Sequence, residues 1–320
     1  MSTAFRFLVN AREKLYNAGI LSTARLNHPV ISVGNLTVGG TGKTPLVIAL
    51  AEALRERGFH PVILSRGYGR TSRGILVVGS NWEESGDEPF LMKRRLAGVP
   101  VVVGADRYEA GRVAEKKELG NIFILDDGFQ HRGLHRDVDI VTIDPVEWEA
   151  GEALLPGGRW REPKSALDRA HAACIQEMDG VAIPAVPVPS FAVRHAVDGL
   201  YAGETRIAAE ILKDVAVVAF AGIAKPERFF ATLESLGIHP VKCVRFRDHH
   251  HYSRREIESL GGDMLVTTEK DAVRLNNITG RTYSYVRISA KIADFEGLMS
   301  LITSRLGRLS AKRKRDSAQP

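Results

Sequence analysis

The stretch Ile31 to Pro45, ISVGNLTVGGTGKTP, begins with a mostly apolar run, continues with a turn that holds three of its four glycines (Gly39, Gly40 and Gly42), and ends in the first residues of a predicted helix. This pattern predicts a buried strand, a tight glycine-rich turn and a helix N-terminus in that order. Such a turn presents successive backbone N–H groups, and the helix start adds its positive dipole end, so together they favour a bound phosphate. We therefore expect a fold built around a phosphate-binding loop.

Individual residues of the turn support this interpretation. Lys43 adds a mobile positive charge, and the hydroxyl of Thr44 is suited to Mg2+. The stretch departs from the strict G-x-x-x-x-G-K-[ST] form, because Thr37 stands five positions before Gly42. A plain glycine-rich surface turn with an exposed lysine is the alternative. The residues expected to contact the phosphates of the ligand are Thr37, Val38, Gly39, Gly40, Thr41, Gly42, Lys43 and Thr44.

Length and composition indicate a globular protein of two domains or lobes. The chain has 320 residues, of which 44% are hydrophobic and 26% charged. These proportions are ordinary for a protein with a sizeable core. The two cysteines, Cys174 and Cys243, lack any C-x-x-C spacing, so they indicate neither a disulfide framework nor a zinc site, and they suit a reducing compartment.

The net charge of +6 suits nucleic acid, an anionic membrane surface or a polyanionic small substrate. The first residues place Phe5, Leu8, Leu15 and Tyr16 near one face of a predicted helix that is too polar to span a bilayer. This helix could lie on a membrane surface or pack on the protein itself, and both interpretations stay open. At the other end, the run Lys312 to Arg315 extends a basic tail that could be attracted to anionic lipid.

Strands and helices are expected to alternate after the phosphate-binding loop, which indicates a parallel sheet covered by helices on both faces. The predicted fold class is α/β: a P-loop NTPase-like, mainly parallel sheet, plus a second, smaller α/β lobe. The ligand should bind at the carboxyl ends of the strands. The first helix should cover 44–57, later helices 88–96 and 108–117, and strands 61–64, 75–78, 101–103, 122–125 and 138–143.

Five segments follow from this pattern. Residues 182–213 begin with several prolines, which remove backbone donors, so this segment is expected to be a linker or small ribbon rather than a central strand. The full division is an amphipathic membrane-surface helix at 1–28, a P-loop kinase domain at 29–181, the linker at 182–213, a C-terminal α/β lobe at 214–309 and a basic disordered tail at 310–320.

Carboxylates occur where a P-loop enzyme would need them. Asp126 and Asp127 end an apolar strand in FILDDGFQH, and such a pair can hold or orient Mg2+, although either residue could simply cap a turn. Asp87 in SGDEPF stands at a probable helix start, where it could be an N-cap or could serve as the base for a hydroxyl acceptor.

Histidine and arginine residues supply further candidates. His249, His250 and His251 are consecutive, so they lack metal-ligand spacing, but one of them could pair with a carboxylate. Three loops combine glycine with arginine, whose planar fork binds phosphate. From these loops Arg66, Arg107 and Arg161 are candidate anion contacts, with ordinary salt bridges as the alternative.

A series of motifs then becomes specific. In order, they are SVGNLTVGGTGKTP, LSRGYGR, GDEP, DRY, ILDDGFQHRGLHRD, LLPGGRWREP, FRDHHHYS and TTEKD. This series resembles the tetraacyldisaccharide 4'-kinases, the lipid A 4'-kinases of Gram-negative bacteria. The resemblance covers nearly the whole chain except the last dozen residues and is thinnest from 182 to 213. The presence of Thr37 in place of a glycine is usual in that family.

The resemblance implies transfer of the ATP γ-phosphate, with Mg2+, to the 4'-hydroxyl of a tetraacyldisaccharide 1-phosphate, which gives lipid IVA. It also implies a peripheral or monotopic protein at the cytoplasmic face of the inner membrane. Asp87 would be the base and His249 its partner, which alignment on Asp248 and Tyr252 favours over the next two histidines. Thr44, Asp126 and Asp127 would lie around Mg2+, and the substrate region would be lined by Tyr68, Arg107, Arg161 and Glu162.

Three rival functions remain to be weighed. A P-loop switch protein would carry [NT]-K-x-D, but in TTEKD the lysine directly precedes Asp271. An ATPase acting on nucleic acid would need a recognisable binding module, which the sequence lacks, so no nucleic acid partner is expected. The nearest alternative is a P-loop kinase or ATPase acting on a soluble anionic small molecule. The sequence names no protein partner.

Overall fold

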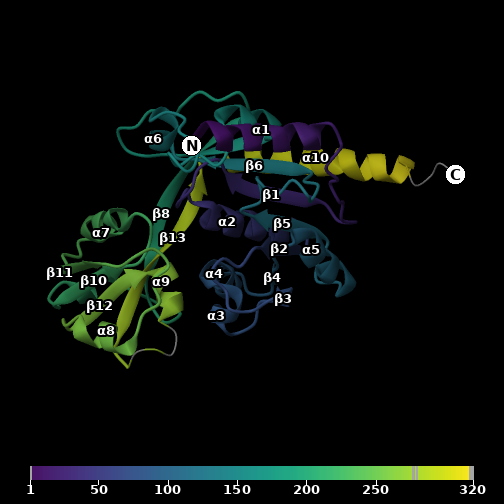
Figure 1. Ribbon diagram of the computed structural model, residues 1–320. Coiled ribbons are helices and arrows are strands. Elements are labelled where there is room, and N and C mark those ends of the chain that lie inside the picture. The colour runs from purple at the N-terminus through teal and green to yellow at the C-terminus, as the bar shows by residue number, and fades with distance from the viewer. Residues whose placement is uncertain (1, 276–277, 279, 317–320) are drawn as a thin grey trace.

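The computed structural model describes residues 2–275, 278 and 280–316, and it shows two lobes joined by long strands (Figure 1). The helices are α1 (Ser2–Asn17), α2 (Lys43–Glu56), α3 (Trp82–Ser85), α4 (Asp87–Arg95), α5 (Arg107–Lys116), α6 (Pro145–Glu149), α7 (Pro226–Ser235), α8 (Arg254–Ser259), α9 (Glu269–Arg274) and α10 (Phe295–Asp316). The strands are β1 (Val30–Asn35), β2 (Pro61–Ser65), β3 (Leu76–Val77), β4 (Val101–Val103), β5 (Ile122–Asp126), β6 (Val138–Ile143), β7 (Ala172–Gln176), β8 (Ser190–Ala202), β9 (Thr205–Ile207), β10 (Val217–Ala221), β11 (Lys242–Arg245), β12 (Met264–Thr268) and β13 (Tyr283–Ile292).

All of these strands belong to one sheet. Their order is β11-β10-β12-β13-β8-β7-β6-β1-β5-β2-β4-β3, and β9 pairs with β8 at the side of this path. The pairing is parallel except where β3 meets β4, β8 meets β13 and β9 meets β8. The sheet is therefore mainly parallel, which confirms the predicted fold class.

Strand β1 shows why helices cover both faces of the first lobe. Successive side chains of a strand point to opposite faces. Ile31 and Val33 pack in one cluster with α2, α4 and α10, while Val30 packs on the other side with α5. Every residue of β1 is buried, as expected for a strand that is covered on both faces.

The second lobe repeats this arrangement on a smaller scale. Strand β10 lies between β11 and β12, parallel to both. Val217 and Ala219 face α7, whereas Val218 and Phe220 face α8. This alternation gives the smaller α/β lobe that the sequence indicated.

The expectation that residues 182–213 avoid the centre of the sheet is wrong. The prolines are confined to 184–189, and the thirteen residues of β8 follow them with their backbone donors intact. Strand β8 pairs with β7 in the first lobe and antiparallel with β13, which in turn pairs with β12 of the second lobe. Strands β8 and β13 thus connect the two lobes as one ribbon (Figure 1).

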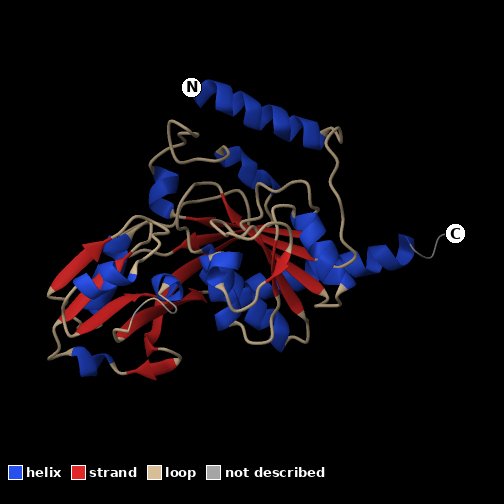
Figure 2. Cartoon of the chain, turned by 60° about the horizontal axis from the view of Figure 1, so that its bottom comes forward, coloured by secondary structure: helices blue, strands red, loops and turns tan. Residues whose placement is uncertain are grey.

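The two ends of the chain are helical. Helix α1 lies along the outside of the first lobe, with loops between it and the sheet (Figure 2). Residues 310–316, expected to be disordered, belong to α10, because this run contains neither proline nor glycine and is rich in good helix formers. Residues 317–320 lie outside the described part. Among the described residues, no helix is long and apolar enough to cross a bilayer.

Candidate active site

The phosphate-binding loop lies where the sequence places it, between β1 and α2. Gly42 precedes α2 with a φ of 77°, a left-handed conformation that favours glycine. No side chain caps the helix N-terminus, so the first N–H groups of α2 stay available to an anion. The loop is held by Asn35, which donates to the carbonyl of Thr37 (2.7 Å) and to Oγ1 of Thr41 (3.0 Å).

The side chain of Thr41 points into the fold. Its hydroxyl lies 2.8 Å from the hydroxyl of Thr142 on β6, and both groups are buried. Among the residues predicted to contact phosphate, Thr41 can therefore take part only through its backbone. Its side chain is occupied in fixing the loop against the sheet.

Asp127 is surrounded by cations. Lys43 lies 3.4 Å from Oδ1, and Nη1 of Arg161 donates to both carboxylate oxygens at 3.0 and 2.8 Å. Burial on its own would raise the pKa of Asp127, but Lys43 and Arg161 lower it below the ordinary value. The carboxylate thus stays charged and holds both cations beside the loop. Arg161, predicted as an anion contact, is salt-bridged to it.

Asp126 has the opposite environment. It ends β5, is buried, and accepts one hydrogen bond from Oγ of Ser65 at 2.9 Å. Burial and the nearby charges of Glu88 and Asp127 raise its pKa to about 7. The positive charge near this carboxylate is therefore too small to offset its burial and its acidic neighbours.

These surroundings fit a magnesium ion. Mg2+ accepts hard oxygen ligands and is commonly held by one or two carboxylates together with substrate phosphates. Asp126 offers an undercompensated carboxylate, and Thr44 places a hydroxyl in the first turn of α2. Among the described residues, no group of three or more His, Cys, Asp or Glu side chains is placed to hold a metal ion.

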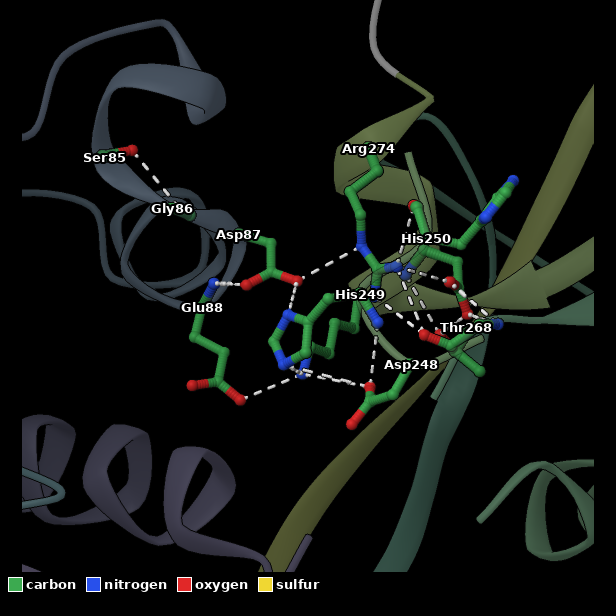
Figure 3. Close-up of polar contacts among 12 residues, drawn as sticks. Ser85, Gly86, Asp87, Glu88, Asp248, His249, His250, Thr268 and Arg274 are labelled. Carbon is green, nitrogen blue, oxygen red and sulfur yellow. Dashed lines mark hydrogen bonds and ion pairs between the residues drawn. The ribbon is translucent and has the colours of Figure 1, made fainter. Parts of the chain in front are cut away.

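Asp87 and His249 meet across the interface between the lobes (Figure 3). Nδ1 of His249 lies 2.9 Å from Oδ2 of Asp87, and it must donate, because a carboxylate only accepts. The other oxygen, Oδ1, accepts the backbone N–H of Glu88 at 2.8 Å. Asp87 is the first residue of α4 rather than its N-cap, which is Gly86.

Two cations from α9 complete this cluster, and the sequence analysis assigned neither of them. Nε of Arg274 lies 3.2 Å from Oδ2 of Asp87 (Figure 3). Nζ of Lys270 lies 3.3 Å from Nε2 of His249 and 3.1 Å from Oε1 of Glu88. Burial would raise the pKa of Asp87, but the hydrogen bond from His249 and the charges of Lys270 and Arg274 lower it to about 2. Asp87 is therefore a charged carboxylate at neutral pH.

Arg274 is fixed by the second lobe. It is 1% exposed, and both of its terminal nitrogens donate to the carbonyl of Gly222, while Nη1 also reaches the carbonyl of His250. Asp271, one helical turn earlier, lies 3.4 Å from Nη1. The second lobe thus presents a rigid guanidinium to a carboxylate of the first.

The three histidines have different environments. His249 has a φ of 57°, which is unusual for a residue other than glycine, and this backbone turn directs its ring to Asp87. His250 stacks on Phe246 and contacts Glu256 at 3.1 Å, and His251 packs on Trp82. Of the three, His249 is the one that reaches the predicted base.

The remaining substrate candidates lie in three different environments. Tyr68 is exposed and packs its ring on His249 at 5.4 Å. Arg107 is buried, its Nε has no hydrogen-bond partner among the described residues, and burial and the neighbouring charge of Arg66 lower its pKa. Glu162 is ion-paired with Arg169 at 2.5 Å. Arg66 and Arg107 therefore place two positive charges close together, with Asp126, Asp127 and Asp106 as the neighbouring carboxylates.

Glu88 connects the two carboxylate sites. It contacts Lys270 beside His249, and its charge contributes to the raised pKa of Asp126. The phosphate-binding loop, the Asp126 site and the Asp87–His249 pair therefore belong to one site between the lobes. The sequence held a signal for the missed cations, because Lys270 lies within the motif TTEKD and Arg274 stands three residues after Asp271, the last residue of that motif.

The chain is similar to known proteins over nearly its whole length. The family model for tetraacyldisaccharide-1-P 4'-kinase matches residues 1–307. A tetraacyldisaccharide 4'-kinase of Koribacter versatilis is 42% identical, over 94% of this chain and 96% of its own. One from Geobacter metallireducens is 40% identical over 88% of each chain. A crystal structure of LpxK from Aquifex aeolicus in complex with ATP is similar with a TM-score of 0.84 and 36% identity, covering 95% of this chain and 97% of that one.

Proposed function

The chain belongs to the tetraacyldisaccharide-1-P 4'-kinase family and uses ATP to phosphorylate the 4'-hydroxyl of its lipid, and we propose that Asp87 accepts the proton of that hydroxyl. The observation that carries this proposal is the contact of Asp87 with His249 across the lobe interface. Oδ2 is occupied by His249 and Arg274, whereas Oδ1 accepts a single N–H and keeps a lone pair for the substrate hydroxyl.

A base with a low pKa is compatible with this chemistry. Phosphoryl transfer passes through a loose transition state, so catalysis depends mainly on positioning and charge neutralisation. A weakly basic carboxylate fixed in place can receive the hydroxyl proton as the new P–O bond forms. Asp87 is only 4% exposed, so we propose that the lobes part to admit the lipid and then close over it.

Around the nucleotide, the residues divide by role. The loop residues 37–44 would bind the phosphates, with Lys43 held in place by Asp127. Asp126 and Thr44 would hold Mg2+, and Asp127 would stand beside it. When bound, the ion neutralises charge on the phosphates.

The lipid would be bound through its anion and its acyl chains. Arg66 and Arg107 bring two positive charges together, which suits the 1-phosphate, with Tyr68 near His249 at the sugar and Arg161 and Glu162 further along. Between α1 and the first lobe, a hollow of about 400 Å³ is lined partly by apolar side chains, including Phe5, Leu8 and Val9. We propose that it accommodates part of the acyl region.

We also propose that α1 docks on the inner-membrane surface, at the cytoplasmic face, as a peripheral or monotopic element. Phe7 and Leu8 are 71% and 64% exposed, while Phe5 packs against the body of the protein. One face of α1 thus packs on the first lobe, and another face presents apolar side chains to the outside. This combines the two interpretations that its sequence left open, packing on the protein and lying on a membrane surface.

The test is transfer of labelled γ-phosphate from ATP, with Mg2+, to tetraacyldisaccharide 1-phosphate in detergent micelles. Wild type should transfer phosphate, whereas Lys43→Ala and Asp87→Ala should not, and Asp87→Ala should still bind ADP. A disaccharide 1-phosphate without acyl chains serves as the competing acceptor. Preference for that soluble acceptor would refute the lipid substrate, and lost ADP affinity in Asp87→Ala would refute its role as the base.

A further inference from the structure

A histidine on the strand that connects the lobes contacts the phosphate-binding loop. His195 lies on β8, and a Cβ placed on Gly42 would come within 2.2 Å of both Cε1 and Nε2 of its ring. The imidazole edge therefore rests directly on the glycine that precedes Lys43. The sequence analysis placed this histidine in a linker and gave it no role.

Hydrogen bonds fix which ring nitrogen carries the proton. Nη1 of Arg228 donates to Oε1 of Gln176 at 3.1 Å, so the other amide atom of Gln176 is its NH2 group. This NH2 group lies 2.8 Å from Nδ1 of His195, which must then be the acceptor. In the neutral ring the proton is consequently on Nε2, the atom that faces Gly42.

The neutral form is favoured, and Nε2 is available. Burial and the positive charge of Arg228 both lower the pKa of His195. Within the described part of the chain, Nε2 has no hydrogen-bond partner. The nearby Arg159 differs, because its Nη2 is already engaged by the carbonyl of Val38 and by Glu147.

We propose that His195 is a nucleotide-binding residue that donates its Nε2–H to a phosphate oxygen of ATP. Backbone N–H groups of such loops bind nucleotide phosphates, and an N–H donor in contact with Gly42 extends that set. Gln176 and Arg228 act as positioning residues, since they set the tautomer from β7 and from α7 of the second lobe. The proposal rests on the proposed assignment of residues 37–44 to the phosphates.

The test replaces the imidazole of His195 with a ring that has no N–H donor. His195→Phe keeps a flat ring against Gly42, and Arg194→Ala, an exposed neighbour on the same strand, is the matched control. Calorimetry with ADP and with a non-hydrolysable ATP analogue, both with Mg2+, should show Kd raised on the order of 10-fold in His195→Phe and unchanged in Arg194→Ala. The KM for lipid should not change in either variant.

Imidazole 15N NMR of the full-length protein supplies a second measurement. Wild type should show a protonated Nε2 that shifts when ADP is added, and Gln176→Leu should lose the single tautomer. An unchanged ADP affinity in His195→Phe, or an Nε2 signal unaffected by ADP, would overturn the proposal. An equal rise in ADP Kd and lipid KM would also overturn it, because His195 would then only shape the ribbon. If wild type binds no ADP, the proposed phosphate-binding loop itself fails.

Discussion

Asp87→Asn tests the interface between the lobes, because the substitution removes one charge and keeps nearly the same shape. The surroundings lower the pKa of Asp87 from 3.8 to about 2, which corresponds to about 2 kcal/mol of stabilisation of the carboxylate. Its side chain is almost fully buried, so solvent does not screen this interaction. We therefore expect Asp87→Asn to lower the free energy of unfolding by about 2 kcal/mol at neutral pH.

The pH dependence of this loss has a defined sign. A carboxyl group whose pKa is lowered in the folded protein stabilises it above the unfolded pKa, and this contribution disappears as pH falls through the folded pKa. The difference in unfolding free energy between wild type and Asp87→Asn should therefore be full above pH 5. It should shrink by about 1 kcal/mol between pH 5 and pH 3.

Activity should fall far more than stability. A positioned base contributes roughly 10²- to 10⁴-fold, so phosphate transfer should fall by about that factor at saturating ATP and lipid. Urea unfolding, ADP binding and phosphate transfer are measured on the same samples, with Asp179→Asn as an exposed control. Transfer at the wild-type rate would refute the base assignment, and a pH-independent stability difference would refute the electrostatic origin.

Three further predictions concern other parts of the site. The pKa of Asp126 is raised, so the free energy of unfolding falls as pH rises from about 4 to 7 and this buried carboxyl group loses its proton. At pH 8, Asp126→Asn should therefore unfold at a higher urea concentration than metal-free wild type, and it should lose Mg2+-dependent phosphate transfer. Equal unfolding midpoints would contradict this prediction. Arg107→Met should raise the KM for the lipid about 10-fold and leave the ADP Kd unchanged, as steady-state kinetics and calorimetry can check. The double variant Phe7→Asp and Leu8→Asp should sediment several-fold less with anionic vesicles, and unchanged sedimentation would exclude α1 from membrane contact.

The sequence predicts those parts of the site that depend on neighbours along the chain. The phosphate-binding loop is recognisable because strand, glycines and helix start are contiguous, and they are found at β1 and α2. Asp126 and Asp127 follow from an apolar strand ending in carboxylates. Their different environments could not be predicted, because Lys43 and Arg161 approach Asp127 from distant segments while Asp126 is buried and accepts a hydrogen bond from Ser65.

Strand β8 shows why the strand at the centre of the sheet could not be predicted from the sequence. Prolines next to an alternating apolar run resemble a linker, since a linker and a strand preceded by prolines share the same local composition. What distinguishes them is the partner, and β13 lies about ninety residues later in the chain. His195 was overlooked for the same reason, since its importance comes from Gly42 and Gln176 rather than from its neighbours in sequence.

The position of Arg274 links the charge of the base to the association of the lobes. Asp87 belongs to α4 of the first lobe, whereas His249, Lys270 and Arg274 all belong to the second. If the lobes separate, Asp87 loses the hydrogen bond and both cations that lower its pKa. The same contacts that hold the lobes together therefore also keep the base charged and oriented. A substitution that weakens the interface should slow phosphate transfer even when every residue around the nucleotide is intact.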